Sequence, residues 1–314
     1  MTSEKAHVFG ALAILFSSVL WGTTGTAATF APEVSATAIG AAAMGGGGIL
    51  QGLIAWRSIM ACWPRLLMHW KYLALGAATV AIYPLAFYAS MRMAGVTIGT
   101  VISIGSAPLL AAVIESQVDG SALTRRWLVG AGLGLVGMAL ISAAEASGHA
   151  APGASSPIIG VLLGLAAGLT YATYSWSARK LMRNGIPSLA AMGSIFGTGG
   201  ILLMPVLAAT GAPFLWSWNN AMVGVYMATV PMLIGYVCFG YGLARVQASM
   251  ATTITLFEPV VAAVLAVVIV GERLPAMGWG GVFLVVLCLI CITVPLEWAK
   301  RPAVAEPIVD AAGE

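Results

Sequence analysis

Charged residues are scarce in this sequence of 314 residues: Asp, Glu, Lys and Arg together make up 8% of it, whereas hydrophobic residues make up 60%. A soluble domain of this length could not cover its surface with so few charges. A basic stripe interleaved with aromatic residues, the usual surface for nucleic acids, is also missing. The composition therefore predicts a polytopic membrane protein that lies in a lipid bilayer and has no nucleic-acid partner.

Residue types that carry catalysis or bind metals are equally few. The three histidines, His7, His69 and His149, lie outside the apolar segments or at their ends, and the only aspartates are Asp119 and Asp310. They cannot assemble a metal site, a Ser–His pair or a pair of aspartates inside a membrane. A Gly-x-x-x-x-Gly-Lys-Ser/Thr phosphate loop is absent too. We predict no enzymatic activity, no catalytic residue, no metal, no cofactor and no ATP-driven transport by this chain itself.

The four cysteines do not indicate a disulfide framework. Cys288 and Cys291 form a Cys-x-x-Cys, but it lies inside an apolar segment with no His or Asp nearby. This setting favours small buried apolar residues over zinc binding or redox chemistry.

Long apolar segments are what the sequence has instead. A membrane helix needs about 20 mostly apolar residues. Ten segments meet this requirement: 7–29, 35–55, 71–91, 96–117, 126–145, 156–178, 188–209, 220–243, 248–270 and 277–296. The first is longer than the core of a signal peptide, so we expect it to be a span. The predicted fold is all-α, with ten transmembrane helices and mostly short connections.

The second half of the chain resembles the first. In residues 96–131 and again in 247–282, a helix of small and hydroxyl residues reaches a proline, Pro108 or Pro259. An Ala-rich stretch and a Gly-x-x-Leu turn follow in both copies. Gly- and Ala-rich helices can look alike by chance, but the order of features around the proline favours internal duplication.

The positions of Lys and Arg orient the chain, because cytoplasmic loops carry an excess of both. If the N-terminus is cytoplasmic, twelve of the fourteen basic residues fall inside: Lys5, Arg57, Arg65, Lys71, Arg125, Arg126, Arg179, Lys180, Arg183, Arg245, Lys300 and Arg301. Only Arg92 and Arg273 fall outside, and the connection 146–157 has no Lys or Arg. We therefore expect two inverted five-helix repeats, residues 1–150 and 151–314, with both termini cytoplasmic.

Spans four and nine carry a polar side chain at every third residue. These are Thr97, Thr100, Ser103 and Ser106 in span four, and Ser249, Thr252, Thr255 and Glu258 in span nine. A proline follows each series and leaves one backbone carbonyl without its helical donor. In a membrane, hydroxyl groups or water must donate a hydrogen bond to that carbonyl. A spacing of three wraps around a helix, so these side chains cannot all face one cavity. Either they allow close helix packing, or they line a path and mark where the helices bend.

Glu258 is the strongest single candidate for a functional residue, because it lies near the middle of span nine. An intramembrane carboxylate is costly and usually functional. It could carry a proton or bind a cationic group of a substrate, or it could stabilise the proline bend. The equivalent position of the first repeat holds Ser106 or Ala107, which have no charge. Glu115 lies nearer the cytoplasmic end of span four, where we expect it to reach water.

Several aromatic residues lie away from the expected membrane interfaces, where they can wall a site for an amphipathic molecule or simply pack. Together with the polar candidates they give the predicted substrate-binding set: Trp21, Tyr83, Tyr88, Ser103, Tyr171, Tyr174, Tyr236, Thr255 and Glu258. Pro108 and Pro259 are the predicted hinges.

With these features the chain resembles the drug/metabolite transporter superfamily, specifically its EamA-type exporters. The resemblance covers nearly the whole chain and is carried by SAPLLAAV in span four and by LFEPVVAAVLAVVIVGERLP in span nine. Asp119-Gly120-Ser121 departs from the Gly-Glu pair that the second repeat keeps at Gly271-Glu272. Length and aromatic content look closest to bacterial YddG-like aromatic amino-acid exporters.

The resemblance implies a basket whose central cavity is walled by helices 1, 3, 4, 6, 8 and 9. It implies export of small amphipathic metabolites, above all aromatic and other neutral amino acids, across the bacterial inner membrane by alternating access, and function as a monomer. A multidrug exporter of cationic xenobiotics and a metabolite importer or exchanger remain alternatives. A phosphate substrate would favour Lys or Arg at mid-span, and there is none. An oligomeric pore is the alternative from a different class.

Overall fold

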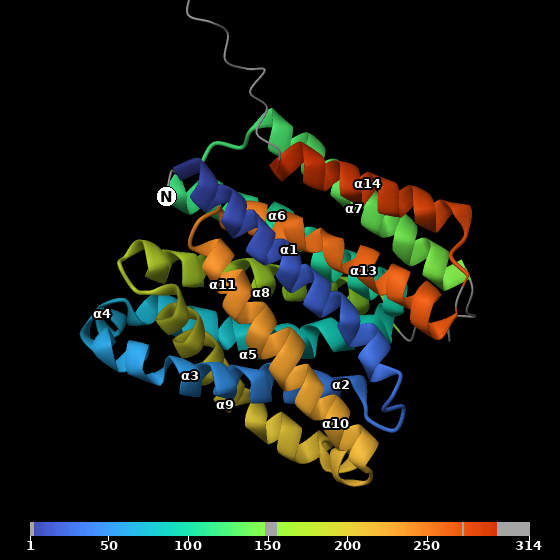
Figure 1. Ribbon diagram of the computed structural model, residues 1–314, viewed down its shortest axis with the longest axis horizontal. Coiled ribbons are helices and arrows are strands. Elements are labelled where there is room, and N and C mark those ends of the chain that lie inside the picture. Colours follow the sequence, from blue (N-terminus) through green and yellow to red (C-terminus); the bar gives the residue numbers. More distant parts are fainter. Residues whose placement is uncertain (1–2, 148–155, 272, 294–314) are drawn as a thin grey trace, which may run out of the picture.

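The protein is described here by a computed structural model that covers residues 3–147, 156–271 and 273–293 (Figure 1). Part of the predicted 146–157 linker, Glu272, and the tail with Lys300 and Arg301 lie outside the described residues. Within them every regular element is helical: α1 (Ser3–Ala28), α2 (Ala36–Gly40), η1 (Ala41–Gly46), α3 (Gly47–Ala61), α4 (Trp63–Met68), α5 (Trp70–Ala94), α6 (Val96–Asp119), α7 (Arg125–Ser147), α8 (Pro157–Arg183), α9 (Ser188–Thr210), η2 (Ala212–Leu215), α10 (Trp218–Met227), η3 (Ala228–Ile234), α11 (Gly235–Leu243), α12 (Ala248–Ile254), η4 (Thr255–Phe257), α13 (Glu258–Leu265), η5 (Ala266–Val270) and α14 (Ala276–Thr293).

The predicted all-α fold with ten spans is confirmed. Ten helices, some of them composite, are long and apolar enough to cross a membrane in the described part of the chain. Spans two and six continue to Ala61 and Arg183, beyond the predicted ends at residues 55 and 178. Basic residues mark these extensions, and Arg and Lys are good helix formers, so a helix does not end where its charges begin.

Three spans change helix type along their length. Span two contains the π-helical segment η1, span eight contains η3, and span nine contains the 3₁₀ turn η4 and the π-helical segment η5. Pro259 explains η4, because it cannot donate to the carbonyl of Thr255. The backbone N–H of Glu258 donates to that carbonyl instead, which tightens the helix locally. In contrast, α6 runs unbroken through Pro108, so the two predicted hinges differ in local structure.

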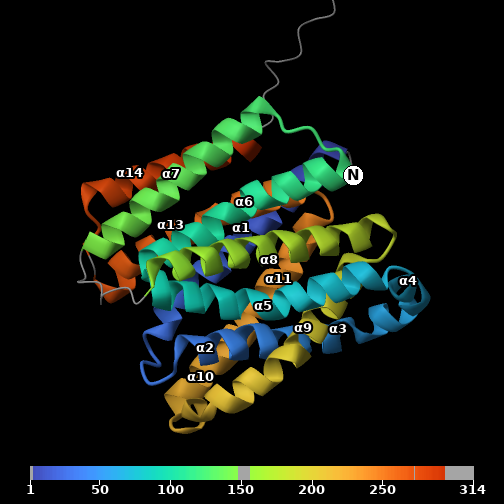
Figure 2. The same ribbon diagram turned by 180° about the vertical axis from the view of Figure 1, so that it is seen from behind.

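Close helix pairs join the two halves of the chain. Span two packs on span seven (α3 on α9), five on ten (α7 on α14), three on six (α5 on α8) and eight on one (α11 on α1). The α7–α14 pair forms one edge of the molecule in both views, and α3, α9 and α10 form the other (Figures 1 and 2). If spans one to five exchange places with spans six to ten, the pairs two–seven and five–ten stay the same. The pairs three–six and eight–one are converted into each other. An approximate two-fold relation between the halves predicts this pattern.

Glycines allow the closest of these contacts. A Cβ atom built on Gly48 of α3 would lie 2.3 Å from the backbone oxygen of Phe196 in α9. The α7–α14 pair is similar, since a Cβ on Gly281 would lie 2.5 Å from the oxygen of Gly137. These contacts are between backbones, so no flexible side chain can move aside. The glycine run at 45–48 is thus a site of close helix packing.

A Gly48→Ala substitution should therefore destabilise the protein. The added methyl group forces α3 away from α9, and such overpacking costs about 1–3 kcal/mol. We expect the midpoint of thermal unfolding in detergent to fall by several degrees. Gly132→Ala in α7 is the matched control, because a Cβ there meets nothing within 4 Å. Equal midpoints for the two variants would contradict the close contact.

Candidate functional site

A cavity of about 370 Å³ lies between the two halves of the chain. Its volume is within the range of small-molecule sites, about 300–1,000 Å³. All six spans that the family resemblance implies contribute to its wall, and spans two and five add residues such as Met44 and Ser142. The wall runs from mid-span residues to Ala28, where α1 ends, and Ala36, where α2 begins. We call the membrane face at these two residues the opposite end, because it lies across the molecule from the basic end described next.

The other face of the molecule is the basic end, where Arg65, Lys180, Arg183 and Arg245 lie near the ends of their helices. Helix α4, which contains Arg65, is labelled on the left of Figure 1. Arg65 of α4 donates to the oxygen of Gly185 at 2.8 Å, which joins two helix connections there. Between this end and the cavity lies a packed aromatic layer that contains Tyr174 and Phe239, both 0% exposed. The cavity therefore extends toward the opposite end and is closed toward the basic end.

The structure brings most of the predicted site residues to this cavity. Its wall includes Trp21, Tyr83, Tyr88, Tyr171, Tyr236, Glu258 and Pro259. The other predicted site and hinge residues, Ser103, Pro108, Tyr174 and Thr255, lie outside the wall. Sequence reasoning did not single out the wall residues Phe87 and Met232, which have no signal beyond their apolar character.

Tyr174 and Thr255 form a layer directly behind the cavity wall. The Tyr174 hydroxyl lies 2.9 Å from that of Tyr236, and the Tyr171 hydroxyl lies 2.9 Å from Thr255 Oγ1. The rings of Tyr171 and Tyr174 are stacked, with centroids 5.2 Å apart. These contacts fix the orientation of two wall tyrosines, so Tyr174 and Thr255 act on the cavity through their neighbours.

Ser103 is buried in the contact between α6 and α8. A Cβ on Gly168 would lie 2.8 Å from the Ser103 backbone oxygen and 1.9 Å from Ser106 Oγ. The hydroxyls of both serines have no hydrogen-bond partner among the described residues. Among the span-four hydroxyl side chains that the structure describes, that of Thr100 lines the cavity. The placement of Ser103 and Ser106 favours the interpretation that they allow close helix packing.

Trp21 is held in the wall by the irregular segment η3. Its indole Nε1 donates to the backbone oxygen of Pro231 at 2.8 Å, and its ring lies 4.6 Å from that of Tyr236. Gln51 of α3 donates to the oxygen of Met232 at 3.1 Å. Side chains of spans one and two thus hold η3 in place through hydrogen bonds to its backbone carbonyls. Gln51 was not predicted, although it is a rare amide within an apolar span.

Glu258 is the only charged residue in the cavity wall formed by the described residues. It begins α13, just after the 3₁₀ turn, and its side chain makes no hydrogen bond or ion pair with any described residue. The phenols of Tyr83, Tyr88, Tyr171 and Tyr236 are close enough to interact with it electrostatically. The result is a single carboxylate facing a neutral aromatic cavity. In the same described part of the chain, no group of three or more His, Cys, Asp or Glu could hold a metal ion.

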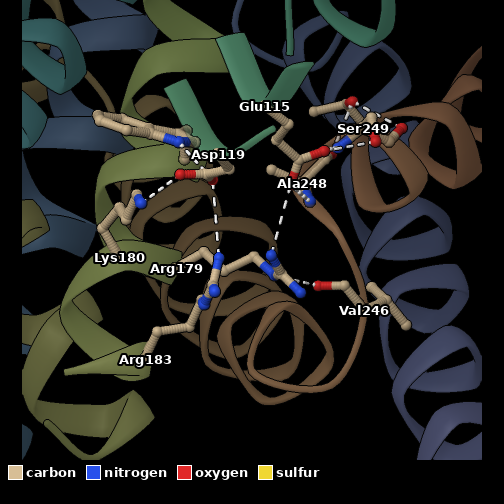
Figure 3. Close-up of polar contacts among 10 residues, drawn as sticks. Glu115, Asp119, Arg179, Lys180, Arg183, Val246, Ala248 and Ser249 are labelled. Atoms are coloured by element: carbon tan, nitrogen blue, oxygen red, sulfur yellow. Dashed lines mark hydrogen bonds and ion pairs between the residues drawn. The ribbon is translucent and has the colours of Figure 1, made fainter. Parts of the chain in front are cut away.

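Glu115 closes the basic end (Figure 3). From α6 it accepts from the backbone N–H of Ala248 at 2.7 Å and of Ser249 at 3.0 Å, and from Ser249 Oγ at 2.5 Å. It thus caps α12, which belongs to the other half of the chain. Arg179 Nη1 of α8 lies 3.5 Å from the same carboxylate, and its Nε donates to the oxygen of Val246 at 2.6 Å. The expectation that Glu115 reaches water was wrong, because these partners bury it to 1% exposure.

A second carboxylate extends the same contact. Asp119 at the end of α6 is paired with Lys180 and lies 3.8 Å from Arg183, and it accepts from Trp176 Nε1 at 3.1 Å. We call Glu115, Asp119, Arg179, Lys180, Arg183 and Ser249 the basic-end cluster. This cluster joins α6 of the first half to α8 and α12 of the second.

Comparison with known proteins gives a consistent picture. The EamA-like transporter family model matches residues 8–143 and 158–294, once in each half. The uncharacterized transporter YwfM of Bacillus subtilis is 31% identical over 294 residues, which are 92% of this chain and 95% of that protein. A solved structure, titled only as the crystal structure of a protein, has a TM-score of 0.71 at 18% identity and covers 90% of this chain and 95% of its own, which supports the fold alone.

Two further relatives have more specific names and match over shorter stretches. The probable terminal-alkyne amino-acid exporter of Streptantibioticus cattleyicolor is 28% identical over 190 residues, 58% of this chain and 61% of that protein. The threonine/homoserine exporter RhtA of Escherichia coli K12 is 26% identical over 117 residues, 37% of this chain and 39% of that protein.

Proposed function

Because this chain belongs to the EamA-like transporter family, and is a multi-pass membrane transporter and not an enzyme, we propose that it exports small amphipathic metabolites, above all aromatic and other neutral amino acids. We place it in the bacterial inner membrane, working as a monomer with both termini in the cytoplasm. Two partial relatives named as amino-acid exporters support the substrate class.

The observation that carries the proposal is the cavity between the two halves. Its wall combines aromatic rings, which suit an apolar side chain, with the carboxylate of Glu258, which suits an amino group. Cationic xenobiotics share these two features, so a multidrug exporter is the second candidate. No basic residue lines the cavity in the described part of the chain, which argues against phosphorylated substrates.

Alternating access would expose this cavity to the two sides of the membrane in turn. In the proposed orientation the basic end is cytoplasmic, so the structure is open outward and the basic-end cluster closes the inner side. Opening inward would require α6 to separate from α8 and α12, and the 3₁₀ turn before Pro259 offers a place for span nine to bend. The paired packing of spans supports the proposed inverted repeats, residues 1–150 and 151–314.

Counterflow in proteoliposomes tests the proposal. Vesicles preloaded with unlabelled phenylalanine should accumulate external radiolabelled phenylalanine transiently and saturably, and tryptophan and other neutral amino acids should compete. Uptake of cationic dyes in place of amino acids would favour the multidrug exporter. A conductance that does not saturate would indicate a pore, and no flux of any of these compounds by folded protein would overturn the proposal.

A further inference from the structure

The cavity has one fixed charge and no counter-charge. Glu258 lines it, and the described wall contains no Lys, Arg or His. Arg179, Lys180 and Arg183 are engaged in the basic-end cluster. Arg92 and Arg273 are exposed and do not belong to the wall. A molecule in the cavity therefore meets a carboxylate but no side-chain cation.

An unpaired carboxylate in a membrane interior is costly, and an ammonium group of the substrate would offset that cost. The ammonium would also lie among electron-rich rings, because Tyr83 and Tyr171, with centroids 5.6 Å apart, both line the cavity beside Glu258. Cation–π attraction adds to an ion pair in such a setting. The wall thus recognises a positive charge in two ways.

The cavity wall is unfavourable for a substrate carboxylate. The wall offers it neutral hydroxyls such as those of Tyr88 and Thr100, and the Glu258 carboxylate would repel it because both charges are negative. The favourable place for it is toward the opposite end, where the cavity wall reaches Ala28 and Ala36 at the ends of their helices. There the N-terminus of α2 and the C-terminus of α1 carry partial charges of opposite sign, which offset each other.

We propose that the cavity selects its substrate by the ammonium group and does not require the carboxyl group. Its substrates would then include aromatic amines and amino-acid amides, which bind more tightly than the parent amino acids. Molecules that keep the carboxylate and lose the amino charge would be excluded. This inference rests on the proposed export function and specifies the substrate class of the same site.

Inhibition of phenylalanine counterflow by related compounds tests whether the cavity recognises the ammonium group or the carboxyl group of its substrate. Phenylalanine, phenylalaninamide, phenethylamine, N-acetylphenylalanine and 3-phenylpropionate share one aromatic group and differ in charge. We expect the amide and the amine to compete at lower concentrations than phenylalanine. The two compounds without an amino charge should be weaker by about thirtyfold or more, the scale for losing one partner of a buried charge pair. Equal competition by N-acetylphenylalanine and phenylalaninamide would overturn the inference and leave amino-acid export standing.

Binding provides a readout that does not depend on transport. Phenethylamine should raise the thermal unfolding midpoint of the purified wild-type protein, whereas 3-phenylpropionate should not. Glu258→Gln should remove the difference, and Glu33→Gln, a change of an exposed carboxylate between α1 and α2, should keep it. If the amine stabilises the protein but phenylalanine is not transported, the proposed export of amino acids fails, and only the selectivity of the cavity for an ammonium group remains. If both compounds stabilise it equally, the inference fails.

Discussion

Replacement of Glu258 by glutamine should lower the efficiency of phenylalanine counterflow by at least about tenfold. The amide has nearly the same shape as the carboxylate but no charge, so it cannot form an ion pair with the amino group of a substrate. Because Glu258 lines the cavity and its side chain has no described partner, the substitution breaks no internal contact and should leave folding intact. Initial rates at a series of substrate concentrations should show the loss mainly as a raised KM.

The dependence of transport on pH provides a second measurement on the same variant. Only the ionised carboxylate can pair with an ammonium, so protonation of Glu258 on acidification should reduce wild-type counterflow. The groups that face it within the described wall are the phenols of Tyr83, Tyr88, Tyr171 and Tyr236. Glu258→Gln should show a flatter profile, and Glu33→Gln should behave as the wild type. Unchanged KM and an unchanged profile in Glu258→Gln would show that this carboxylate has a structural role only.

Removal of the Glu115 carboxylate should shift the conformational equilibrium toward the state open at the basic end. Glu115→Ala leaves the N–H groups of Ala248 and Ser249 without an acceptor and Arg179 without its pair. Breaking a buried charge pair costs about 3–5 kcal/mol. That cost falls on the closed state, because these groups reach water once α6 and α12 separate. A shift between about a hundredfold and several thousandfold in the population ratio is therefore expected.

Cysteine labelling can detect this shift. Ala251 of α12 is 0% exposed, so Ala251→Cys in a background without the four native cysteines should react slowly with a maleimide. Adding Glu115→Ala should accelerate labelling by about tenfold or more. Glu33→Ala is the matched control and should leave the rate unchanged. If Glu115→Ala is folded and labels as slowly as the background, the basic-end cluster is a static contact and not a gate.

The helices and the central carboxylate could be predicted because their signals are local. Ten apolar segments of about 20 residues each determine ten spans, whatever their neighbours are. Glu258 stands out as a charge within such a segment. Five of the aromatic residues expected away from the interfaces line the cavity: Trp21, Tyr83, Tyr88, Tyr171 and Tyr236. Spans two and six extend past the predicted ends because Lys and Arg are compatible with helix.

The direction in which each side chain points could not be predicted, because it depends on how each helix is rotated when it packs against its neighbours. Ser103 and Thr100 are three residues apart, yet one is buried against α8 and the other lines the cavity. Glu115 was expected to reach water because it lies nearer the cytoplasmic end of span four. Its partners Ala248 and Ser249 are more than 130 residues away in the sequence, so no local pattern indicated them. Tyr174 and Thr255 were predicted to line the site but lie one layer behind the cavity wall, because helix rotation cannot be deduced from sequence spacing.

An experimental structure with bound phenylalanine or phenylalaninamide would show whether the cavity between the two halves is the substrate site. We expect the ligand between α1, α5, α8 and α13, with its amino nitrogen in hydrogen-bond contact with a carboxylate oxygen of Glu258 and its ring among Trp21, Tyr83 and Tyr171. A ligand bound elsewhere, or one whose amino group faces away from Glu258, would contradict it.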